Sequence, residues 1–442
     1  MFKRLLCILL AVLMLMPLIS CGEKKPVEIR DDALFTPDLE GTDQSNWVEV
    51  IASEEHQTIQ GFGGINYPTW IADLSEEQRK TAFTNDGTDT LGFTVLRIAV
   101  SPNKADWEKE VETAKYAQEQ GALVFASPWN PPDNMCERFE HNGNKNAKRL
   151  RHDKYADYAQ HLNDFVSFMK ENGVELYAIS IQNEPDYADE WTWWSTDEIM
   201  DFILNYSDAI DCRIMTPEAF QYRKEFYNAI LNDETALSKV DIFGTHFYGT
   251  QKNDMAYPLF EQKGEGKELW MTEVYVPNSS DDADLWPQAI DVAVNMNNGL
   301  VTGNMQAYVW WYIRRFYGPM KEDGTISKRG YCMAHYSKFV RPGYVRIGAT
   351  ENPATGVSVS AYKGDGKIII VAINHSLKTY GQNFKLTDAD TINYIEAYTT
   401  NMQDNLKRTG NIAFENERFG YVLPPESVTT FVVSTNTESA EK

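Results

Sequence analysis

The sequence predicts an α/β protein in which a (β/α)8 TIM barrel carries a side domain of β-strands. Strand-like apolar runs alternate with amphipathic helical patterns over roughly 280 residues, and eight such runs occur. After residues 341–343, which read Arg-Pro-Gly, the helical pattern stops and short β-branched runs separated by turn residues follow. A strand-like run at 47–51 precedes the barrel and can pair with that later module.

The barrel strands are predicted where apolar and β-branched residues cluster between turn signals. Between them, Trp107, Val111 and Ala114 recur at helical spacing within 106–120, and a second such pattern covers 155–170. Eight strand and helix alternations fit a closed barrel better than an open, doubly wound sheet. The eight predicted strands are residues 58–65, 94–100, 122–127, 176–181, 213–216, 240–246, 268–272 and 306–312.

The start of the chain predicts an export signal. A basic Met-Phe-Lys-Arg start, an apolar run from Leu5 to Leu18 and small residues before Cys21 resemble a bacterial lipoprotein signal, in which that cysteine is lipidated. The protein is therefore expected to be exported and lipid-anchored to the bacterial cell envelope. The predicted organisation is a signal peptide over 1–21, a flexible tether over 22–43, an N-terminal strand within 44–56, the catalytic barrel over 57–340, a β-sandwich over 341–435 and a disordered tail over 436–442.

Charge limits the classes of partner. The chain has 442 residues with 41 Lys and Arg against 64 Asp and Glu, a net charge of −23. A field of that sign repels nucleic acid and anionic lipid, so neither is an expected partner. We expect a monomer that touches the membrane only through its lipid anchor.

The cysteines indicate neither a disulfide framework nor a metal centre. After removal of the signal, Cys136, Cys212 and Cys332 remain, an odd number that matches no Cys/His ligand spacing. We expect free thiols, no metal and no organic cofactor.

Two glutamates carry the predicted chemistry. Glu184 follows the fourth predicted strand and Glu273 follows the seventh. Functional groups of such barrels lie at the carboxyl ends of the strands, and strands four and seven face each other across the barrel mouth. Two facing carboxylates are what glycosidic bond cleavage requires, whether with retention or with inversion.

Several motifs resemble glycoside hydrolase family 30, and more narrowly its bacterial glucuronoxylanase subfamily, subfamily 8. The likeness runs from about residue 57 to residue 434. It implies a barrel with a side β-sandwich and retaining endo-hydrolysis of β-1,4-xylan, with Glu184 as acid/base and Glu273 as nucleophile. The motifs are Gln60-Gly-Phe-Gly-Gly64, Ala126-Ser-Pro-Trp-Asn-Pro-Pro132, Ser180-Ile-Gln-Asn-Glu-Pro-Asp186, Trp270-Met-Thr-Glu273 and Tyr308-Val-Trp-Trp-Tyr-Ile-Arg-Arg315.

The resemblance also implies recognition of a (4-O-methyl)glucuronic acid branch by a Trp, an Arg and a Tyr after the eighth strand. Trp311, Arg315 and Tyr317 keep the family's spacing, which favours Arg315 over its neighbour Arg314. A guanidinium can hold a uronate carboxylate through two parallel hydrogen bonds.

The loop after the seventh strand is expected to hold the same branch. Tyr275 matches the family there, whereas the next position, usually Ser, is Asn278, with Ser279 beside it. An amide can donate in place of a hydroxyl, so this departure affects the strength of uronate binding more than its existence.

The remaining candidates line or support the site. Asn183 resembles the residue that hydrogen-bonds the sugar 2-hydroxyl in this clan. Arg97 is expected to orient or charge Glu273, and His246 either does likewise or is a core histidine. Trp129 and Trp70 are predicted as stacking platforms of the cleft, and Tyr187, Tyr248 and Trp191 as the lining of more distant subsites.

Two other functions stay open at this point. Another family 30 activity, such as a β-1,6-glucanase or a glucosylceramidase-like enzyme, is disfavoured because a neutral substrate offers no carboxylate to Arg315. A non-catalytic, glycan-binding surface lipoprotein is disfavoured because it has no reason to keep both glutamates.

Overall fold

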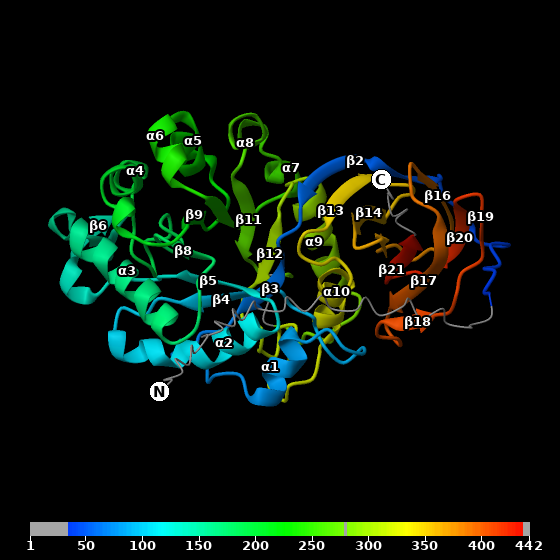
Figure 1. Ribbon diagram of the computed structural model, residues 1–442, viewed down its shortest axis with the longest axis horizontal. Coiled ribbons are helices and arrows are strands. Elements are labelled where there is room, and N and C mark those ends of the chain that lie inside the picture. Colours follow the sequence, from blue (N-terminus) through cyan, green and yellow to red (C-terminus); the bar gives the residue numbers. More distant parts are fainter. Residues whose placement is uncertain (1–33, 278–280, 436–442) are drawn as a thin grey trace, which may run out of the picture. The chain divides into compact units, whose positions relative to one another are not determined.

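Eight parallel strands close into a barrel, which confirms the predicted fold class (Figure 1). The computed structural model describes residues 34–277 and 281–435. Each barrel strand overlaps one of the eight predicted runs, so the apolar patterns located the barrel correctly. Around the barrel the strands are β3 (Gly61–Ile65), β4 (Val95–Ala99), β5 (Leu123–Ser127), β8 (Ala178–Ser180), β9 (Ile214–Ala219), β10 (Ile242–His246), β11 (Glu268–Glu273) and β12 (Ala307–Trp310).

Helices follow the barrel strands, and their buried faces match the helical spacing of apolar residues. On α3, Tyr158, Leu162, Phe165 and Met169 are all buried. Capping boxes begin α1 and α4, where Ser75 and Ser195 each accept a hydrogen bond from a backbone amide three residues later. The helices are α1 (Glu76–Phe83), α2 (Val111–Glu119), α3 (Tyr155–Glu171), α4 (Thr196–Asn205), α5 (Lys224–Asn232), α6 (Glu234–Lys239), α7 (Lys252–Met255), α8 (Pro258–Lys263), α9 (Ile290–Val301) and α10 (Lys328–Ser337), with 3-10 turns η1 (Lys104–Glu110), η2 (Asp133–Met135), η3 (His152–Lys154) and η4 (Ser207–Ala209).

The predicted side sandwich is a single curled sheet of 11 strands around its own apolar core. β2 lies between β13 and β16, so the N-terminal strand joins the C-terminal module as expected. The β13–β2 pairing contains two register shifts, a device that lets a sheet bend and fold over itself. Its strands are β1 (Asp43–Gln44), β2 (Val48–Thr58), β13 (Val345–Ala349), β14 (Val357–Gly364), β15 (Lys367–Asn374), β16 (Tyr380–Thr387), β17 (Ile392–Thr400), β18 (Lys407–Thr409), β19 (Phe414–Glu415), β20 (Arg418–Leu423) and β21 (Ser427–Thr435).

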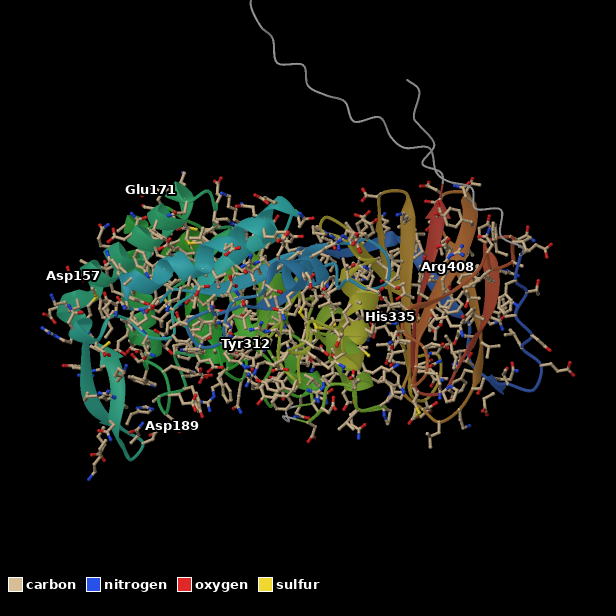
Figure 2. All side chains as sticks on the ribbon, turned by 90° about the horizontal axis from the view of Figure 1, so that it is seen from below. Asp157, Glu171, Asp189, Tyr312, His335 and Arg408 are labelled. Carbon is tan, nitrogen blue, oxygen red and sulfur yellow. The ribbon has the colours of Figure 1, made fainter. Side chains whose placement is uncertain are left out.

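Barrel and sheet share one apolar core. Tyr362, Ile369 and Val432 of the sheet belong to the same buried cluster as the barrel helices. At this junction His335 of α10 is completely buried (Figure 2). Its Nδ1 lies 2.8 Å from the hydroxyl of Thr430, and its Nε2 lies 2.9 Å from that of Thr400. The sheet is therefore packed against the barrel rather than tethered to it.

The prediction of a flexible tether is wrong for its last part. β1 pairs in parallel with β16, and the Phe35 amide donates to the Asn411 carbonyl at 2.6 Å, so residues 34–43 lie along the sheet. The signal peptide, Cys21 and the tail after residue 435 fall outside the described residues. Among residues 34–277 and 281–435, we find no helix whose length and hydrophobicity suit a membrane span.

Candidate active site

Glu184 and Glu273 meet at the carboxyl ends of the barrel strands. Glu273 is the last residue of β11, and Glu184 lies in the loop that follows β8. Glu184 has a backbone φ of +47°, an uncommon conformation for a residue with a side chain, and its amide donates to the Glu218 carbonyl at 3.0 Å. The loop is thus tied to β9, which aims the side chain into the barrel mouth.

The separation of the two carboxylates suits direct attack on a sugar. One oxygen of Glu184 and one of Glu273 lie within 4.8 Å of each other. Retaining glycosidases hold their carboxyl groups about 5 to 5.5 Å apart, whereas inverting enzymes need about 6.5 to 9.5 Å to admit a water. The spacing, which the sequence alone left open, therefore belongs to the retaining class.

Glu273 accepts hydrogen bonds from two directions. Arg97, inside β4 and completely buried, donates from one guanidinium nitrogen to Oε2. The hydroxyl of Tyr248 donates to Oε1 at 3.0 Å. Burial raises the pKa of Glu273, His246 and Arg97 oppose the rise, and the charge of Glu184 adds to it.

Glu184 is held by a different pair of groups. Nδ1 of His246 lies 2.8 Å from Oε1, and the indole nitrogen of Trp191 donates to Oε2 at 2.8 Å. Burial favours the neutral imidazole, but the carboxylates of Glu273, Glu184 and Glu218 outweigh it and raise the pKa of His246 to about 9. His246 is therefore a cation at neutral pH and lies closer to Glu184 than to Glu273, whose Oε2 is 3.9 Å from Nε2.

A third carboxylate, Glu218 at the end of β9, was not predicted from the sequence. Its Oε2 accepts from the Ser127 hydroxyl at 2.7 Å, and its Oε1 lies 3.1 Å from a nitrogen of Arg97. Burial opposes ionisation of this side chain, yet Arg97 and His246 prevail and lower the pKa of Glu218 to about 2. An acidic residue just after a strand-like run was the available signal, but the predicted strand ended at residue 216, whereas β9 continues through Pro217 to Ala219.

Asn183 is completely buried beside the pair. Its side-chain oxygen accepts from Arg97 at 2.6 Å, and its Nδ2 has no hydrogen-bond partner among the described residues. The amide is thus fixed with one donor unused at the edge of the site.

The two catalytic candidates open into a cavity of about 220 Å³ walled by aromatic rings. Trp70, which is 42% exposed, stacks on Trp191 at 5.6 Å and lies 6.2 Å from Trp311. Trp129 is almost fully buried and belongs to the floor of the cavity. The lining residues are Trp129, Glu184, Tyr187, Glu190, Trp191, Phe220, Tyr248, Glu273, Tyr275 and Trp311.

Two aromatic assignments differ from the prediction. Tyr248 and Trp191 were expected in distant subsites, but each hydrogen-bonds one of the two central carboxylates. Their place in the sequence gave no sign of this, because the contacts cross between different strand ends. Tyr187 stacks on Phe220 at 4.9 Å and does line the cavity.

The structure distinguishes the two neighbouring arginines after β12. Arg314 is bound to the protein itself, through the Gln78 side chain at 2.8 Å and the Ala72 carbonyl at 2.5 Å. The side chain of Arg315 is 34% exposed, and its one ion-pair contact among the described residues is Glu322 at 3.9 Å. Arg315 is therefore the arginine that can receive an external anion.

A row of tyrosines joins this arginine to the catalytic pair. The ring of Tyr248 lies 5.5 Å from that of Tyr275, which lies 5.2 Å from that of Tyr317. The Arg315 guanidinium lies 5.8 Å from the Tyr317 ring centre. Asn278 and Ser279 fall outside the described residues, so their predicted part is not placed.

The chemistry of the side chains does not favour a metal centre. Glu184, His246 and Glu273 could each offer one ligand atom within 4.8 Å of the others. Nδ1 of His246 is already engaged with Glu184 at 2.8 Å, and the raised pKa of His246 favours the protonated imidazole, which has no lone pair to offer. The positive charge of this site is supplied by Arg97 and His246.

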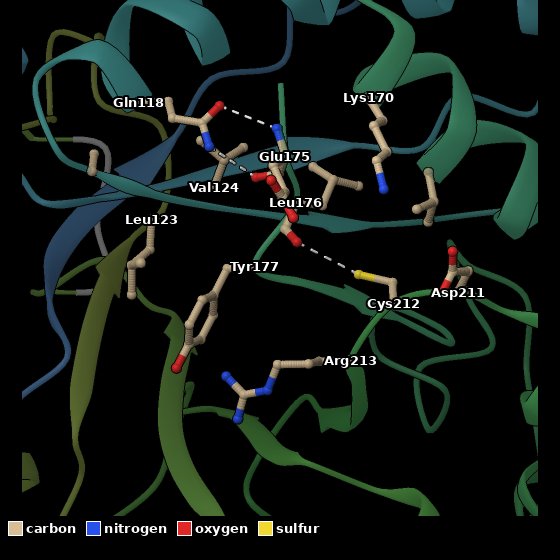
Figure 3. Close-up of a pocket in the computed structure, with 12 residues that line it drawn as sticks. Gln118, Leu123, Val124, Lys170, Glu175, Leu176, Tyr177, Asp211, Cys212 and Arg213 are labelled. Atoms are coloured by element: carbon tan, nitrogen blue, oxygen red, sulfur yellow. Dashed lines mark hydrogen bonds between the residues drawn. The ribbon is translucent and has the colours of Figure 1, made fainter. Parts of the chain in front are cut away.

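A larger cavity of about 440 Å³ lies at the other end of the barrel (Figure 3). Leu123, Tyr177 and Arg213, which line it, stand at or just before the first residues of β5, β8 and β9. In TIM barrels that end supports stability rather than catalysis. Cys212 in its wall donates to the Leu176 carbonyl at 3.7 Å, and burial raises the pKa of its thiol to about 12.

The three cysteines within the described residues are all free thiols. Cys332 is fully buried, whereas Cys136 and Cys212 are partly buried. Burial raises the pKa of Cys136 to about 11, so this thiol is also unreactive at neutral pH.

Comparison with known proteins shows to which family the chain belongs. No family model matches the chain. It is 58% identical over 388 residues to the glucuronoxylanase XynC of Bacillus subtilis (strain 168), an alignment covering 88% of this chain and 92% of that protein. Among solved structures, a GH30 endoxylanase from Clostridium papyrosolvens C71 matches with 43% identity and a TM-score of 0.83.

A second similar solved structure belongs to a defined subfamily. Xyn30A of Clostridium acetobutylicum, a glycoside hydrolase family 30 subfamily 8 xylanase, matches with 33% identity and a TM-score of 0.80. Each of the two structural alignments covers 88% of this chain and 100% of the solved one. The chain therefore belongs to glycoside hydrolase family 30 and, within it, to the bacterial glucuronoxylanases of subfamily 8.

Proposed function

We propose that the protein is a retaining endo-β-1,4-glucuronoxylanase, which cuts the xylan backbone at positions set by glucuronic acid branches. The observation that carries the proposal is the pair Glu184 and Glu273, with oxygens within 4.8 Å at the mouth of the barrel. The 58% identity to a glucuronoxylanase supports the substrate class.

In the first step Glu273 is the nucleophile. Its carboxylate attacks the anomeric carbon, the bond from that carbon to the leaving oxygen breaks, and Glu184 gives its proton to that oxygen. Arg97 and Tyr248 both donate to Glu273, so they hold the attacking carboxylate in place and favour its charge. The product of this step is a glycosyl ester of Glu273.

In the second step Glu184 is the base. It takes a proton from water, the water oxygen attacks the anomeric carbon, and Glu273 leaves as a carboxylate. His246 at 2.8 Å from Glu184 is well placed to stabilise the carboxylate that Glu184 becomes between the two steps. Two displacements at one carbon give net retention of configuration.

Recognition of the branch is assigned to Arg315 together with Trp311, Tyr317 and Tyr275. A uronate is an anion, and the general field of a chain with net charge −23 repels it. A local guanidinium that is not consumed by an internal salt bridge offsets this repulsion and fixes the branch by two parallel hydrogen bonds. Arg315 is partly exposed and its ion-pair contact to Glu322 is long, at 3.9 Å, so it meets that requirement.

Mass analysis of the products from glucuronoxylan tests the proposal. We expect every product to carry one uronate at a fixed distance from its reducing end. Products with variable branch positions would show that the branch does not direct cutting. Absence of new reducing ends would favour a non-catalytic glycan-binding protein.

The location in the cell is proposed from the sequence alone. Cys21 in its signal-like context is proposed to carry the lipid that anchors a monomeric enzyme to the cell envelope. Replacing Cys21 by Ser should move the protein from the membrane fraction to the soluble fraction, and an unchanged distribution would contradict the anchor.

A further inference from the structure

Glu218 is placed in the site by an irregular end of β9. Between β9 and β10 the pairing passes from Gly244 with Pro217 to Thr245 with Ala219, so Glu218 is an extra, bulged residue. Its backbone φ is +52°, and its side chain is completely buried. A Cβ on Gly244 would lie 2.8 Å from Cγ of Glu218, so glycine there makes room for this side chain.

The contacts of Glu218 reach both catalytic glutamates through other groups. Its Oε1 lies 3.1 Å from the Arg97 nitrogen and 3.8 Å from Nε2 of His246. Arg97 contacts Glu273, and His246 contacts Glu184. Glu218 therefore shares both cations with the reacting pair, and its own backbone carbonyl accepts a hydrogen bond from the Glu184 amide.

The charge of Glu218 changes the net charge of the buried site. The two positive charges of Arg97 and protonated His246 equal the two negative charges of ionised Glu184 and ionised Glu273. With these four groups alone the site is neutral, and no excess negative charge favours uptake of a further proton. With Glu218 ionised as well, the five groups carry one excess negative charge in a buried space. Uptake of one proton removes that excess, and only Glu184 and Glu273 remain to receive it.

We propose that Glu218 is a positioning residue whose negative charge lets Glu184 retain the proton that it must donate to the leaving oxygen. Arg97 contacts Glu273 and cannot lose its charge, whereas His246 can exchange its Nδ1 proton with Glu184 at 2.8 Å. Burial raises the pKa of Glu273, but Arg97 donates to that carboxylate and opposes the rise, so the geometry assigns the proton to the Glu184 side of the pair. The inference rests on the proposed function, because it explains why Glu184, the general acid of that reaction, holds the proton that it donates.

Other titratable groups near the network are few within the described residues. Tyr248 donates to Glu273 from the loop after β10. Asp186, after β8, accepts from the Phe220 amide at 2.9 Å and lies 3.8 Å from Arg223, and its field also favours the charged His246. Neither Tyr248 nor Asp186 contacts Glu218, so the charge of Glu218 can be changed while the contacts of these two residues remain.

The pH dependence of kcat/KM on glucuronoxylan tests the proposal. Glu218→Gln keeps the shape of the side chain and removes its charge, so Glu184 should lose its proton more readily. We expect the alkaline limb of the profile to move to lower pH by about one unit or more. Glu218→Asp, which restores the charge at a slightly greater distance, should return the limb toward that of the unmodified enzyme.

Glu110→Gln is the matched control. Glu110 is 1% exposed and its two carboxylate oxygens have no hydrogen-bond partner among the described residues, but it lies outside this network. Burial raises the pKa of Glu110 well above its usual value, so this substitution replaces a buried, neutral carboxyl group without touching Arg97 or His246 and should leave the profile in place. If Glu218→Gln folds and its alkaline limb coincides with that of the unmodified enzyme, the proposal is wrong.

A titration of the unmodified protein needs neither a variant nor a substrate. With ¹³C at the glutamate carboxyl carbons, the signal of Glu218 should show an ionised carboxylate with a pKa below the usual 4.5. A Glu218 carboxyl that titrates at or above that value overturns the proposal, even if the variant cannot be folded. Because this measurement does not depend on xylan cleavage, its failure is distinct from failure of the proposed function.

Discussion

Nδ1 of His246 lies 2.8 Å from Oε1 of Glu184, whereas its Nε2 lies 3.9 Å from the nearest oxygen of Glu273. The imidazole therefore belongs to the acid/base side of the site and Arg97 to the nucleophile side. This division predicts that the two glutamates fail differently when each is replaced by glutamine.

For Glu184→Gln we expect a loss of roughly 100-fold to 10,000-fold in kcat on glucuronoxylan, the usual contribution of a general acid. The rate of the first step should fall much less on an aryl xyloside, because a good leaving group departs without a proton. Added azide, which needs no general base, should restore turnover on that substrate. Equal losses on both substrates would contradict the role of Glu184.

For Glu273→Gln we expect turnover to disappear on every substrate, since no covalent intermediate can form without the carboxylate. Binding of xylan should persist, because the aromatic walls of the cavity are unchanged. Binding is measured by calorimetry with xylo-oligosaccharides and turnover by reducing-sugar release. Retained turnover would end the assignment of Glu273.

Tyr248→Phe removes one of the two donors to Glu273 and keeps the ring packing on Phe220 at 5.3 Å. A hydrogen bond to a charged group contributes about 1.5 to 3 kcal/mol, so kcat should fall roughly tenfold to a hundredfold. Tyr187→Phe is the control, because Tyr187 lines the same cavity without contacting a catalytic carboxylate. A distant-subsite role for Tyr248, as the sequence suggested, would instead raise KM with little change in kcat.

The sequence was sufficient for the barrel because its strands are buried on both faces and read as continuous apolar runs. It also located Glu184, Glu273 and Arg97, since each stands at or within such a run. The hairpin of β6 (Cys136–His141) and β7 (Asn144–Leu150) was missed because its residues are mostly polar or charged and show no apolar alternation.

The contacts between side chains of the active site could not be predicted from the sequence in the same way. Glu218 was hidden because β9 continues through Pro217 and bulges, which a pattern of apolar residues does not reveal. The bond from Trp191 to Glu184 depends on how a loop folds back over the barrel mouth. Periodicity fixes which face a residue takes, but not which distant side chain it meets.

Arg315→Ala should lower the rate on glucuronoxylan by about 2 kcal/mol or more, roughly thirtyfold, because it removes the charge partner of a substrate carboxylate. The rate on undecorated xylan should change little, which makes that substrate the internal control. Arg315→Lys should recover part of the loss, since an ammonium keeps the charge but not the paired hydrogen bonds. An equal loss on both substrates would remove Arg315 from uronate recognition.

The junction between barrel and sheet should weaken in acid because of His335. Burial lowers the pKa of this imidazole from 6.5 to about 3, so between these values the unfolded chain binds the proton and the folded protein does not. The stabilising contribution is therefore complete above pH 6.5 and is lost as the pH falls toward 3, at about 1.4 kcal/mol for each pH unit in between. His335→Gln removes this titration and keeps an amide that can bond the hydroxyls of Thr400 and Thr430.

Urea midpoints measured at several pH values between about 7 and about 4 test this expectation. Stability of the unmodified protein should fall more steeply than that of His335→Gln, because the titration of every other group is common to both proteins and cancels in the difference. His375→Gln, which replaces an exposed imidazole of the sheet domain, should follow the unmodified protein. Parallel curves for the unmodified protein and His335→Gln would mean that His335 is not held neutral at the junction.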